Sequence, residues 1–273
     1  MRAQKIKRTV LAVFMWILSL IVLIPLLLII INSFKTSAEA DIMTLKLPEV
    51  WQFANFAVAV AESNIFRTFL NSVLITGVSV LASSILGTMA GYSLSRNRDK
   101  INRGVYSYFL LGLVVPVQVI ALIQVLQKFR MMDSYAGIIF VYIAMFVPLS
   151  VFLAYSFVSS VPKELDEAAV MDGATPLQLF FHIIRPMLTP VIVTSFITQF
   201  VFIWNDFQYP LYLLSSSSKW TIVLGVYKFI GQFGSDWNIV CAYILLSSLP
   251  VVIVYLAGQK YIISGMVAGA VKG

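Results

Sequence analysis

The chain has 273 residues, of which 60% are hydrophobic and 11% are charged, and its formal net charge at pH 7 is +7. Soluble domains carry about 25% charged residues, so this composition excludes an ordinary soluble domain and indicates a protein of the lipid bilayer. The positive charge does not indicate nucleic-acid binding, because the basic residues form short islands between apolar runs. A single cysteine and a single histidine exclude an intramolecular disulfide and a histidine-based metal cluster.

Six uncharged stretches are long enough to cross a bilayer as helices, which takes about 20 apolar residues. In chain order they are Thr9–Phe34, Thr68–Ser95, Gly104–Gln127, Ser134–Pro162, Pro186–Asn205 and Trp237–Gln259. A stretch inside hydrocarbon must satisfy its own backbone hydrogen bonds, which predicts a helix for each one. Glycine and proline within the runs, as at Gly87 and Pro116, are expected to be tolerated. The predicted fold is all-α, a polytopic membrane protein with six transmembrane helices.

The predicted organisation has four parts. Residues 1–34 hold the N-terminus and the first helix, 35–67 an extracytoplasmic loop, 68–259 a core with five transmembrane helices, and 260–273 a C-terminal tail. The first apolar run is too long for a signal-peptide core, so we expect it to stay as an anchor. Six spans put both termini on one side, and 12 of the 19 basic residues fall on that side. The positive-inside rule therefore places both termini in the cytoplasm.

The connection between the fourth and fifth spans, residues 161–185, is long and dense in helix signals. Pro162 suits a first helical position, and Glu164, Asp166 and Glu167 favour the positive end of a helix dipole. These signals predict a short cytoplasmic helix.

The same helix has a predicted apolar face and a predicted end. Leu165, Ala168 and Ala169 share one face at helical spacing, and alanines let the backbone of another protein come close. Gly173 is placed to end the helix in a left-handed conformation. The loop could also be an amphipathic helix on the membrane surface. Its excess of acids disfavours that reading, because anionic lipids prefer lysine and arginine.

A second helix start follows at once. Thr175 is a candidate cap, Pro176 occupies the first position, and Gln178 stands three residues after the cap. Pro186 is then expected to begin the next span. The sequence predicts two short helices that meet at a sharp bend.

This loop resembles the cytoplasmic EAA loop of permease subunits of binding-protein-dependent ABC importers. The resemblance rests on Glu167-Ala168-Ala169, on Gly173 four positions later, and on Ile183 and Pro186. Arg185 stands where that family usually has leucine. The resemblance covers roughly Phe69 to Gly273 and includes Asn71-Ser72, Trp204-Asn205-Asp206-Phe207 and Ala268-Gly269-Ala270-Val271-Lys272-Gly273. The last two stretches resemble the maltose-permease-type branch that imports oligosaccharides.

The resemblance implies a transport subunit without catalytic or metal-binding residues, in a bacterial or archaeal cytoplasmic membrane. Its implied partners are a second homologous permease, two ATP-binding cassette subunits and an extracytoplasmic solute-binding protein. ATP and Mg²⁺ would be bound by the ATPase subunits, and the chain has no G-x-x-x-x-G-K-[ST] phosphate loop. The C-terminal tail would contact the ATPase subunits or be a frayed terminus. The residues implied in ATPase coupling are Glu167, Ala168, Ala169, Asp172, Gly173 and Pro186.

Polar side chains inside spans usually face a cavity or a neighbouring helix, which makes them candidates for the solute pathway. Aromatic rings beside amide and carboxylate groups suit a sugar, which offers apolar ring faces and hydroxyls. Asn205 and Asp206 could instead cap the fifth span, and Gln118 and Gln124 could bond neighbouring helices. The pathway candidates are Asn71, Gln118, Gln124, Trp204, Asn205, Asp206 and Tyr209.

Three other functions compete with sugar import by an ABC transporter. A secondary transporter or facilitator would need buried ionisable residues for ion coupling, and Asp206 is the only candidate. A membrane-embedded enzyme would need paired carboxylates or a nucleophile constellation, which the spans lack. An ABC importer for amino acids or peptides is separated from a sugar importer only by the branch-specific stretches.

Overall fold

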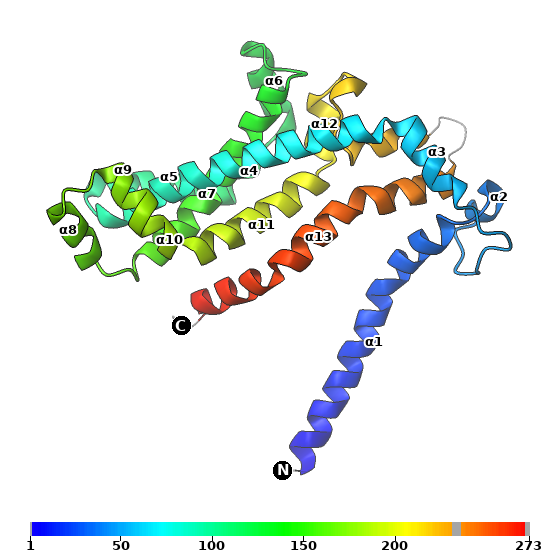
Figure 1. Ribbon diagram of the computed structural model, residues 1–273, viewed down its shortest axis with the longest axis horizontal. Helices are drawn as coiled ribbons and strands as arrows, with labels where there is room; N and C mark the ends of the chain where they lie inside the picture. The colour runs from blue at the N-terminus through cyan, green and yellow to red at the C-terminus, as the bar shows by residue number, and fades with distance from the viewer. Residues whose placement is uncertain (1, 231–235, 271–273) are drawn as a thin grey trace. The chain divides into compact units, whose positions relative to one another are not determined.

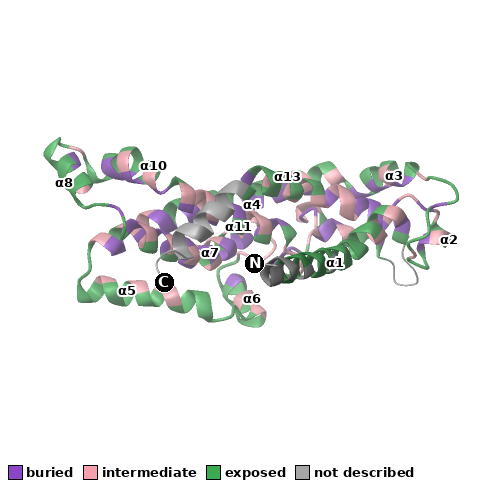
Figure 2. Cartoon of the chain, turned by 90° about the horizontal axis from the view of Figure 1, so that it is seen from below, coloured by how far each residue is buried: buried purple, intermediate pink, exposed green. Residues whose placement is uncertain are grey.

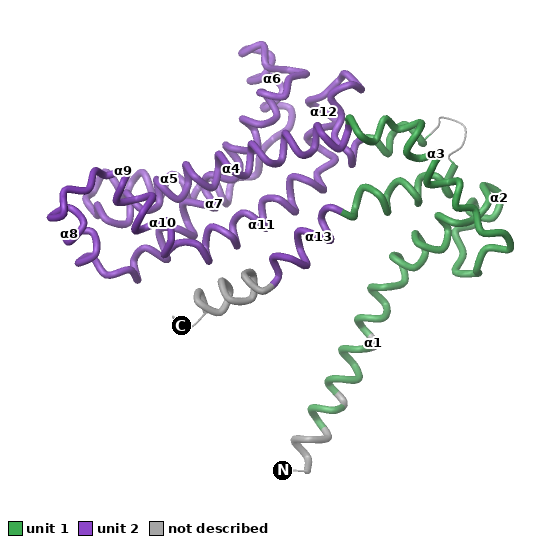
Figure 3. Tube along the Cα trace, in the orientation of Figure 1, with its two compact units in different colours: residues 1–67, 225–249 green, residues 68–224, 250–273 purple. Residues whose placement is uncertain are grey.

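A computed structural model describes residues 2–230 and 236–270, and every regular element in those ranges is helical (Figure 1). The chain forms two compact units, which Figure 3 colours separately. Unit 1 comprises residues 1–67 and 225–249, and unit 2 comprises residues 68–224 and 250–273.

Unit 1 is organised around a buried lysine. It contains α1 (Arg2–Asn32), α2 (Ser37–Ala40), α3 (Ala54–Ser63) and the first turns of α13 (Trp237–Ala270). The Lys35 side chain is 1% exposed, and its Nζ donates to Asn32 Oδ1 at 3.0 Å and to the Thr44 carbonyl oxygen at 2.8 Å. A buried charge is costly unless it is hydrogen-bonded, so these acceptors are what permit its burial. Asn55 of α3 donates to the carbonyls of Ser33 and Lys35, which ties this helix to the end of α1.

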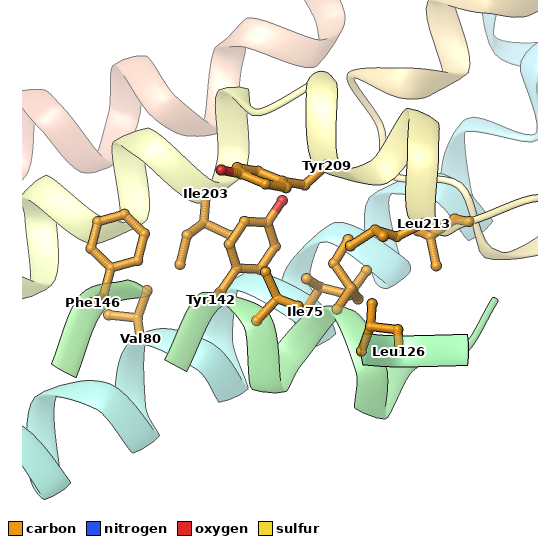
Figure 4. Packing of buried hydrophobic residues seen from close by; sticks show 11 residues of the cluster. Ile75, Val80, Leu126, Tyr142, Phe146, Ile203, Tyr209 and Leu213 are labelled. Carbon is orange, nitrogen blue, oxygen red and sulfur yellow. The ribbon is translucent and has the colours of Figure 1, made fainter. Parts of the chain in front are cut away.

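Unit 2 carries the larger core. Its elements are α4 (Ile65–Arg96), α5 (Lys100–Val114), α6 (Val119–Lys128), α7 (Tyr135–Val158), α8 (Glu164–Met171), α9 (Pro176–Gln178), the π-helix η1 (Leu179–Ile184), α10 (Arg185–Met187), α11 (Thr189–Asn205), α12 (Gln208–Leu213) and the 3₁₀ turn η2 (Ser217–Lys219). A second 3₁₀ turn, η3 (Leu224–Phe229), begins at Leu224 and otherwise belongs to unit 1. Apolar side chains from α4, α6, α7, α11 and α12 meet in one cluster, shown in Figure 4.

Helices α4 and α7 pack closely because glycines of α4 face α7. A Cβ atom added to Gly91 would lie 2.8 Å from Ala154 Cβ, and one added to Gly87 would collide with Ser150. Small residues at such contacts are typical of helix packing in membranes, where close approach supplies the attraction.

A buried polar cluster joins α4, α7 and α11. Gln199 is fully buried, and its Nε2 donates to Ser150 Oγ at 2.8 Å and to Ser195 Oγ at 2.7 Å. Its Oε1 accepts from the Ser83 hydroxyl. Because each of these polar groups finds a partner, the hydrogen bonds offset the cost of burying the cluster, which fixes the three helices in register.

Four described helices, α1, α4, α7 and α13, are long and apolar enough to span a membrane, and two bent pairs raise the number of candidate spans to six. In the first pair, α5 and α6 meet at 118°. The expectation of one helix over Gly104–Gln127 is therefore wrong. Pro116 cannot donate a backbone hydrogen bond and biases the preceding residue away from helix. Val115 and Gln118 are accordingly extended, with ψ of 117° and 116°.

The second bent pair contains the fifth predicted span. Pro176–Met187 and α11 meet at 79°, and Leu188 caps α11. Pro186 lies in α10 and does not begin the span helix, contrary to expectation. α11 has 17 residues, which at 1.5 Å per residue spans about 26 Å.

Candidate functional site

Residues 161–185, named the coupling loop after the role that the resemblance implies, contain α8 near their start. This helix starts at Glu164 with Lys163 as its cap, so Pro162 precedes the helix and does not occupy its first position as predicted. Glu164, Asp166 and Glu167 lie in the first turn, where carboxylates interact favourably with the helix dipole.

Gly173 ends α8 in the predicted way, with a φ of +83°. The Gly173 N–H donates to the Val170 carbonyl at 3.0 Å, and the Ala174 N–H donates to the Ala169 carbonyl at 3.0 Å. This pair of hydrogen bonds is the Schellman motif, which needs a left-handed residue at the position of Gly173. Asp172 is the exposed last residue before it. The predicted left-handed bend is confirmed.

The faces of α8 differ from the prediction at one residue. Ala169 is 4% exposed and packs in an apolar cluster with Val158, Leu179, Phe180, Ile184 and Leu188. Ala168 and Glu167 are exposed, so the two alanines lie on different sides of the helix. Successive helical residues point about 100° apart, which is why neighbours in sequence separate in this manner. Val170 and Met171 are 60% and 87% exposed, and Figure 2 shows most of α8 as exposed surface.

The second helix start follows the prediction and then departs from a regular α-helix. The Thr175 N–H donates to Gln178 Oε1 at 2.9 Å, and the Gln178 N–H donates back to the Thr175 hydroxyl, which forms a capping box. The chain then runs through the π-helix η1, where the Arg185 N–H bonds the Phe180 carbonyl five residues back. Pro186 has no N–H for the carbonyl four residues before it, which favours an irregular hydrogen-bond pattern at this point.

Sequence reasoning missed Arg96, the last residue of α4, and treated it only as a topology signal. Its Nε lies 2.7 Å from Asp166 Oδ2. The available signal was weak, because one arginine at a helix end is ordinary and 69 residues separate it from Asp166 in the chain.

Asp206 lies where α11 gives way to α12, in contact with a buried tyrosine. The Tyr142 hydroxyl donates to Asp206 Oδ2 at 2.7 Å, and the Gln208 N–H donates to Asp206 Oδ1 at 2.9 Å. The Asp206 carboxylate therefore bonds the start of α12 and also bonds α7. The Tyr142 and Tyr209 rings meet edge to face at 6.2 Å, and Figure 4 shows the Tyr142 hydroxyl directed toward this turn.

The Asn71 side chain forms hydrogen bonds to other residues of this chain through both its nitrogen and its oxygen. Its Nδ2 donates to the carbonyls of Ser218 at 3.1 Å and Trp220 at 2.9 Å, and its Oδ1 accepts from the Tyr135 hydroxyl at 2.8 Å. These bonds indicate a structural role, and a role in the solute pathway remains a prediction.

The other pathway candidates are scattered over unit 2. Trp204 is 2% exposed and stacks on Phe200 at 5.4 Å, whereas the neighbouring Asn205 is exposed and donates to its own helix. Gln118 lies at the break between α5 and α6, and Gln124 lies on α6, both exposed. The structure brings Asp206 and Tyr209 together and leaves the two glutamines on a separate helix.

Residues 83–266 match the family described as the binding-protein-dependent transport system inner membrane component. The chain belongs to this family. It is the membrane permease component of such a transporter and not its catalytic subunit.

Named relatives cover nearly the whole permease. MelC of Bacillus subtilis (strain 168), a melibiose/raffinose/stachyose import permease protein, is 34% identical over 92% of this chain and 91% of its own length. AmyC of Thermoanaerobacterium thermosulfurigenes, a probable starch degradation products transport system permease protein, is 32% identical over 100% of both chains.

A solved structure has the same fold. One chain of a bacterial ABC transporter that imports the acidic polysaccharide alginate superposes with a TM-score of 0.83, covering 96% of this chain and 98% of its own. The two are 22% identical in sequence, so this likeness shows the fold alone.

Proposed function

We propose that this permease is one of two homologous membrane subunits of an importer for sugars or oligosaccharides. The near full-length similarity to permeases named for raffinose-type sugars and starch products supports this substrate class. Two cytoplasmic ATPase subunits would bind ATP and Mg²⁺, and an extracytoplasmic solute-binding protein would deliver the solute. Both termini would lie in the cytoplasm, as the distribution of basic residues predicts.

The coupling loop would dock on an ATPase subunit through α8. The exposed side chains of Ala168, Val170 and Met171 offer an apolar surface, and Glu167 beside them offers an ionic contact. Exposed apolar surface outside the hydrocarbon core is typical of a protein contact. Asp172 and Gly173 would set the direction in which α8 points. Ala169 and Pro186 would act from within the loop, by packing and by shaping the chain into α11.

The solute pathway would include the turn between α11 and α12. A carboxylate can accept about four hydrogen bonds, so Asp206 keeps acceptor capacity beyond its bonds from Tyr142, Gln208 and Tyr209, and Asn205 is exposed next to it. Tyr209 would hold Asp206 in place through the aromatic contact with Tyr142. Asn71 and Trp204 would support this region from inside the bundle, and Gln118 and Gln124 would line the pathway from the broken helix.

Two measurements test the proposal. The chain is tagged in its host and purified in mild detergent, and its stoichiometric companions are identified by mass spectrometry. A second permease and an ATPase are expected, and recovery of the chain alone from membranes that support uptake would contradict the importer. Uptake of labelled oligosaccharides and amino acids is then compared with a strain that lacks the chain. Loss of amino-acid uptake with intact oligosaccharide uptake would contradict the substrate class.

A further inference from the structure

One side chain, Arg96, ties the end of α4 to the coupling loop. Its Nε donates to Asp166 Oδ2 at 2.7 Å and its Nη2 donates to Asp166 Oδ1 at 3.2 Å. The guanidinium and the carboxylate therefore form a bidentate ion pair, which constrains the relative orientation of the two side chains as well as the distance between them. The two side chains are only 12% and 17% exposed, so water screens the pair weakly.

The same guanidinium also reaches the backbone between α7 and α8. Its Nη1 donates to the Val161 carbonyl at 3.0 Å and the Val158 carbonyl at 3.4 Å, and Nη2 donates to the Pro162 carbonyl at 3.4 Å. Val158 is the last residue of α7, and Val161 and Pro162 lie in the connection, so Arg96 bonds both the helix end and the chain that follows it. The end of α7, the connection and α8 are thus held by one residue of α4.

Tyr92, one turn before Arg96 on α4, strengthens the arrangement. Its hydroxyl donates to Asp166 Oδ2 at 2.9 Å, and the Arg96 Cζ lies 5.8 Å from the centre of its ring. Asp166 therefore accepts from two residues of α4, and the tyrosine ring supports the guanidinium by a cation–π contact.

The coupling loop is connected covalently to some helices of unit 2 and only by side-chain contacts to α4. The coupling loop continues from α7 and leads into α11, so the backbone carries any displacement of α8 to both of those helices. α4 has no such covalent connection to the loop. Its packing contact through Tyr92 and Phe180, at 5.9 Å between ring centres, is not directional. The Arg96–Asp166 pair is a directional contact between α4 and α8.

We infer that Arg96 and Asp166 are positioning residues that make α4 move together with α8 when the ATPase subunits close. The inference rests on the proposed docking of the coupling loop on an ATPase subunit. Without the pair, α8 still docks and the ATPase still works, but the movement of α8 reaches α4 only through the hydrogen bond from Tyr92 to Asp166 and through apolar contacts that can slide. The signature of this role is a lower number of solute molecules transported per ATP hydrolysed.

The experiment uses the full transporter in proteoliposomes with its solute-binding protein. Uptake and ATP hydrolysis are measured for Arg96→Ala, Arg96→Lys and Asp166→Asn. We expect the ratio of solute to ATP to fall about 10-fold in Arg96→Ala, within the range of typical coupling factors. Arg96→Lys keeps the positive charge but loses the bidentate geometry, so its ratio of solute to ATP should fall less than that of Arg96→Ala. Arg98→Ala is the matched control, because Arg98 is exposed and donates to the neighbouring Ser95 carbonyl.

Assembly is measured in parallel by co-purification of the ATPase subunits. A reduced ratio with preserved assembly supports the inference, and an unchanged ratio in Arg96→Ala and Asp166→Asn overturns it. If Arg96→Ala fails to assemble, Asp166→Asn and Arg96→Lys decide in the same way. The double variant Arg96→Ala/Asp166→Ala should lose less than the sum of the losses of the two single alanine variants, because effects of interacting residues are not additive. If the wild-type chain recovers no ATPase, the proposed function fails first, which separates that failure from a failure of the inference.

Discussion

Two loops of unit 2 are each held by an ion pair, yet they differ in what they leave exposed. In the 214–222 loop, Lys219 lies 3.0 Å from Asp133, and Asp133 also accepts from the Ser216 N–H at 3.1 Å. The loop is fastened further along its length, by Asn71 and by the bond from the Trp220 indole N–H to the Leu214 carbonyl at 3.1 Å.

The coupling loop is anchored along one edge only. Arg96 and the apolar cluster around Ala169 hold its inner side, whereas Val170 and Met171 point outward. A loop whose polar groups form hydrogen bonds within the chain is suited to stay fixed in position. A loop with a firm inner edge and an apolar outer face is suited to receive a force from another protein and pass it inward.

The largest effect on stability is expected from Asn71→Ala, which would release the 214–222 loop. The substitution removes the hydrogen bonds from Asn71 to the Ser218 and Trp220 carbonyls and the bond that Asn71 accepts from the Tyr135 hydroxyl. We expect a loss of about 2–4 kcal/mol in the free energy of unfolding. Thermal unfolding in detergent measures it, with Asn205→Ala as the control. The Asn205 amide is exposed and bonds its own helix, so that variant should unfold near the wild-type temperature.

The next effect concerns the coupling loop, through Gly173→Val. Open space surrounds a Cβ at this position, so the cost comes from the φ of +83° and not from a collision. A β-branched residue strongly disfavours this conformation, and α8 should shift or lose its bend. We expect transport to fall about 10-fold, equivalent to a backbone strain of roughly 1–3 kcal/mol, while membrane insertion persists.

Gly173→Asn is the control for this prediction, because asparagine adopts left-handed conformations readily. It should retain most of the transport activity that is lost in Gly173→Val. Equal uptake by the wild type and Gly173→Val would count against both the bend and its coupling role.

A smaller effect is expected at Asp206, which belongs to neither loop. Asp206→Ala removes the acceptor for the Tyr142 hydroxyl and one polar group of the proposed pathway. Uptake should fall about fivefold, the equivalent of roughly 1 kcal/mol for one hydrogen bond, with normal recovery of the ATPase subunits. Tyr142→Phe separates the two roles, because it removes the bond and keeps the carboxylate. If both variants lose uptake equally, Asp206 acts through its bond to Tyr142 and not on the solute.

The sequence predicted local features of the coupling loop well, because each depends on neighbouring residues. The left-handed Gly173 and the Thr175–Gln178 capping box are set by the chemistry of a few adjacent positions. The six candidate spans were predictable because a helix needs a minimum apolar length to cross the hydrocarbon core of a bilayer. Part of the C-terminal stretch that marked the sugar branch, residues 271–273, lies outside the described residues.

Features that depend on distant residues were not predictable in this way. The helix break at Pro116 could have been a kink within one span, and only the tertiary structure turns it through 118°. The inward orientation of Ala169 depends on the position of α8 over Val158 and Leu179. The Arg96–Asp166 pair joins residues far apart in the chain, and no local pattern reveals such a contact.

The smallest effect is expected from Asp133→Asn, which tests the ion pair of the 214–222 loop by pH. Hydrogen bonds from Ser216 and the charge of Lys219 lower the pKa of the Asp133 carboxyl from 3.8 to about 2. A carboxyl with a depressed pKa in the folded state stabilises that state above its unfolded pKa, and the contribution is lost as the pH falls through the folded value. Asparagine tolerates the positive φ at this position, 49°, so the substitution changes charge without straining the backbone. At pH 7 the variant should unfold at a slightly lower temperature. The loss in free energy of unfolding should be less than about 1 kcal/mol, because the ion pair is partly exposed. The difference from wild type should stay constant from pH 7 to about pH 4 and shrink toward pH 2, and a difference that grows on acidification would show that the Asp133 charge does not stabilise this loop.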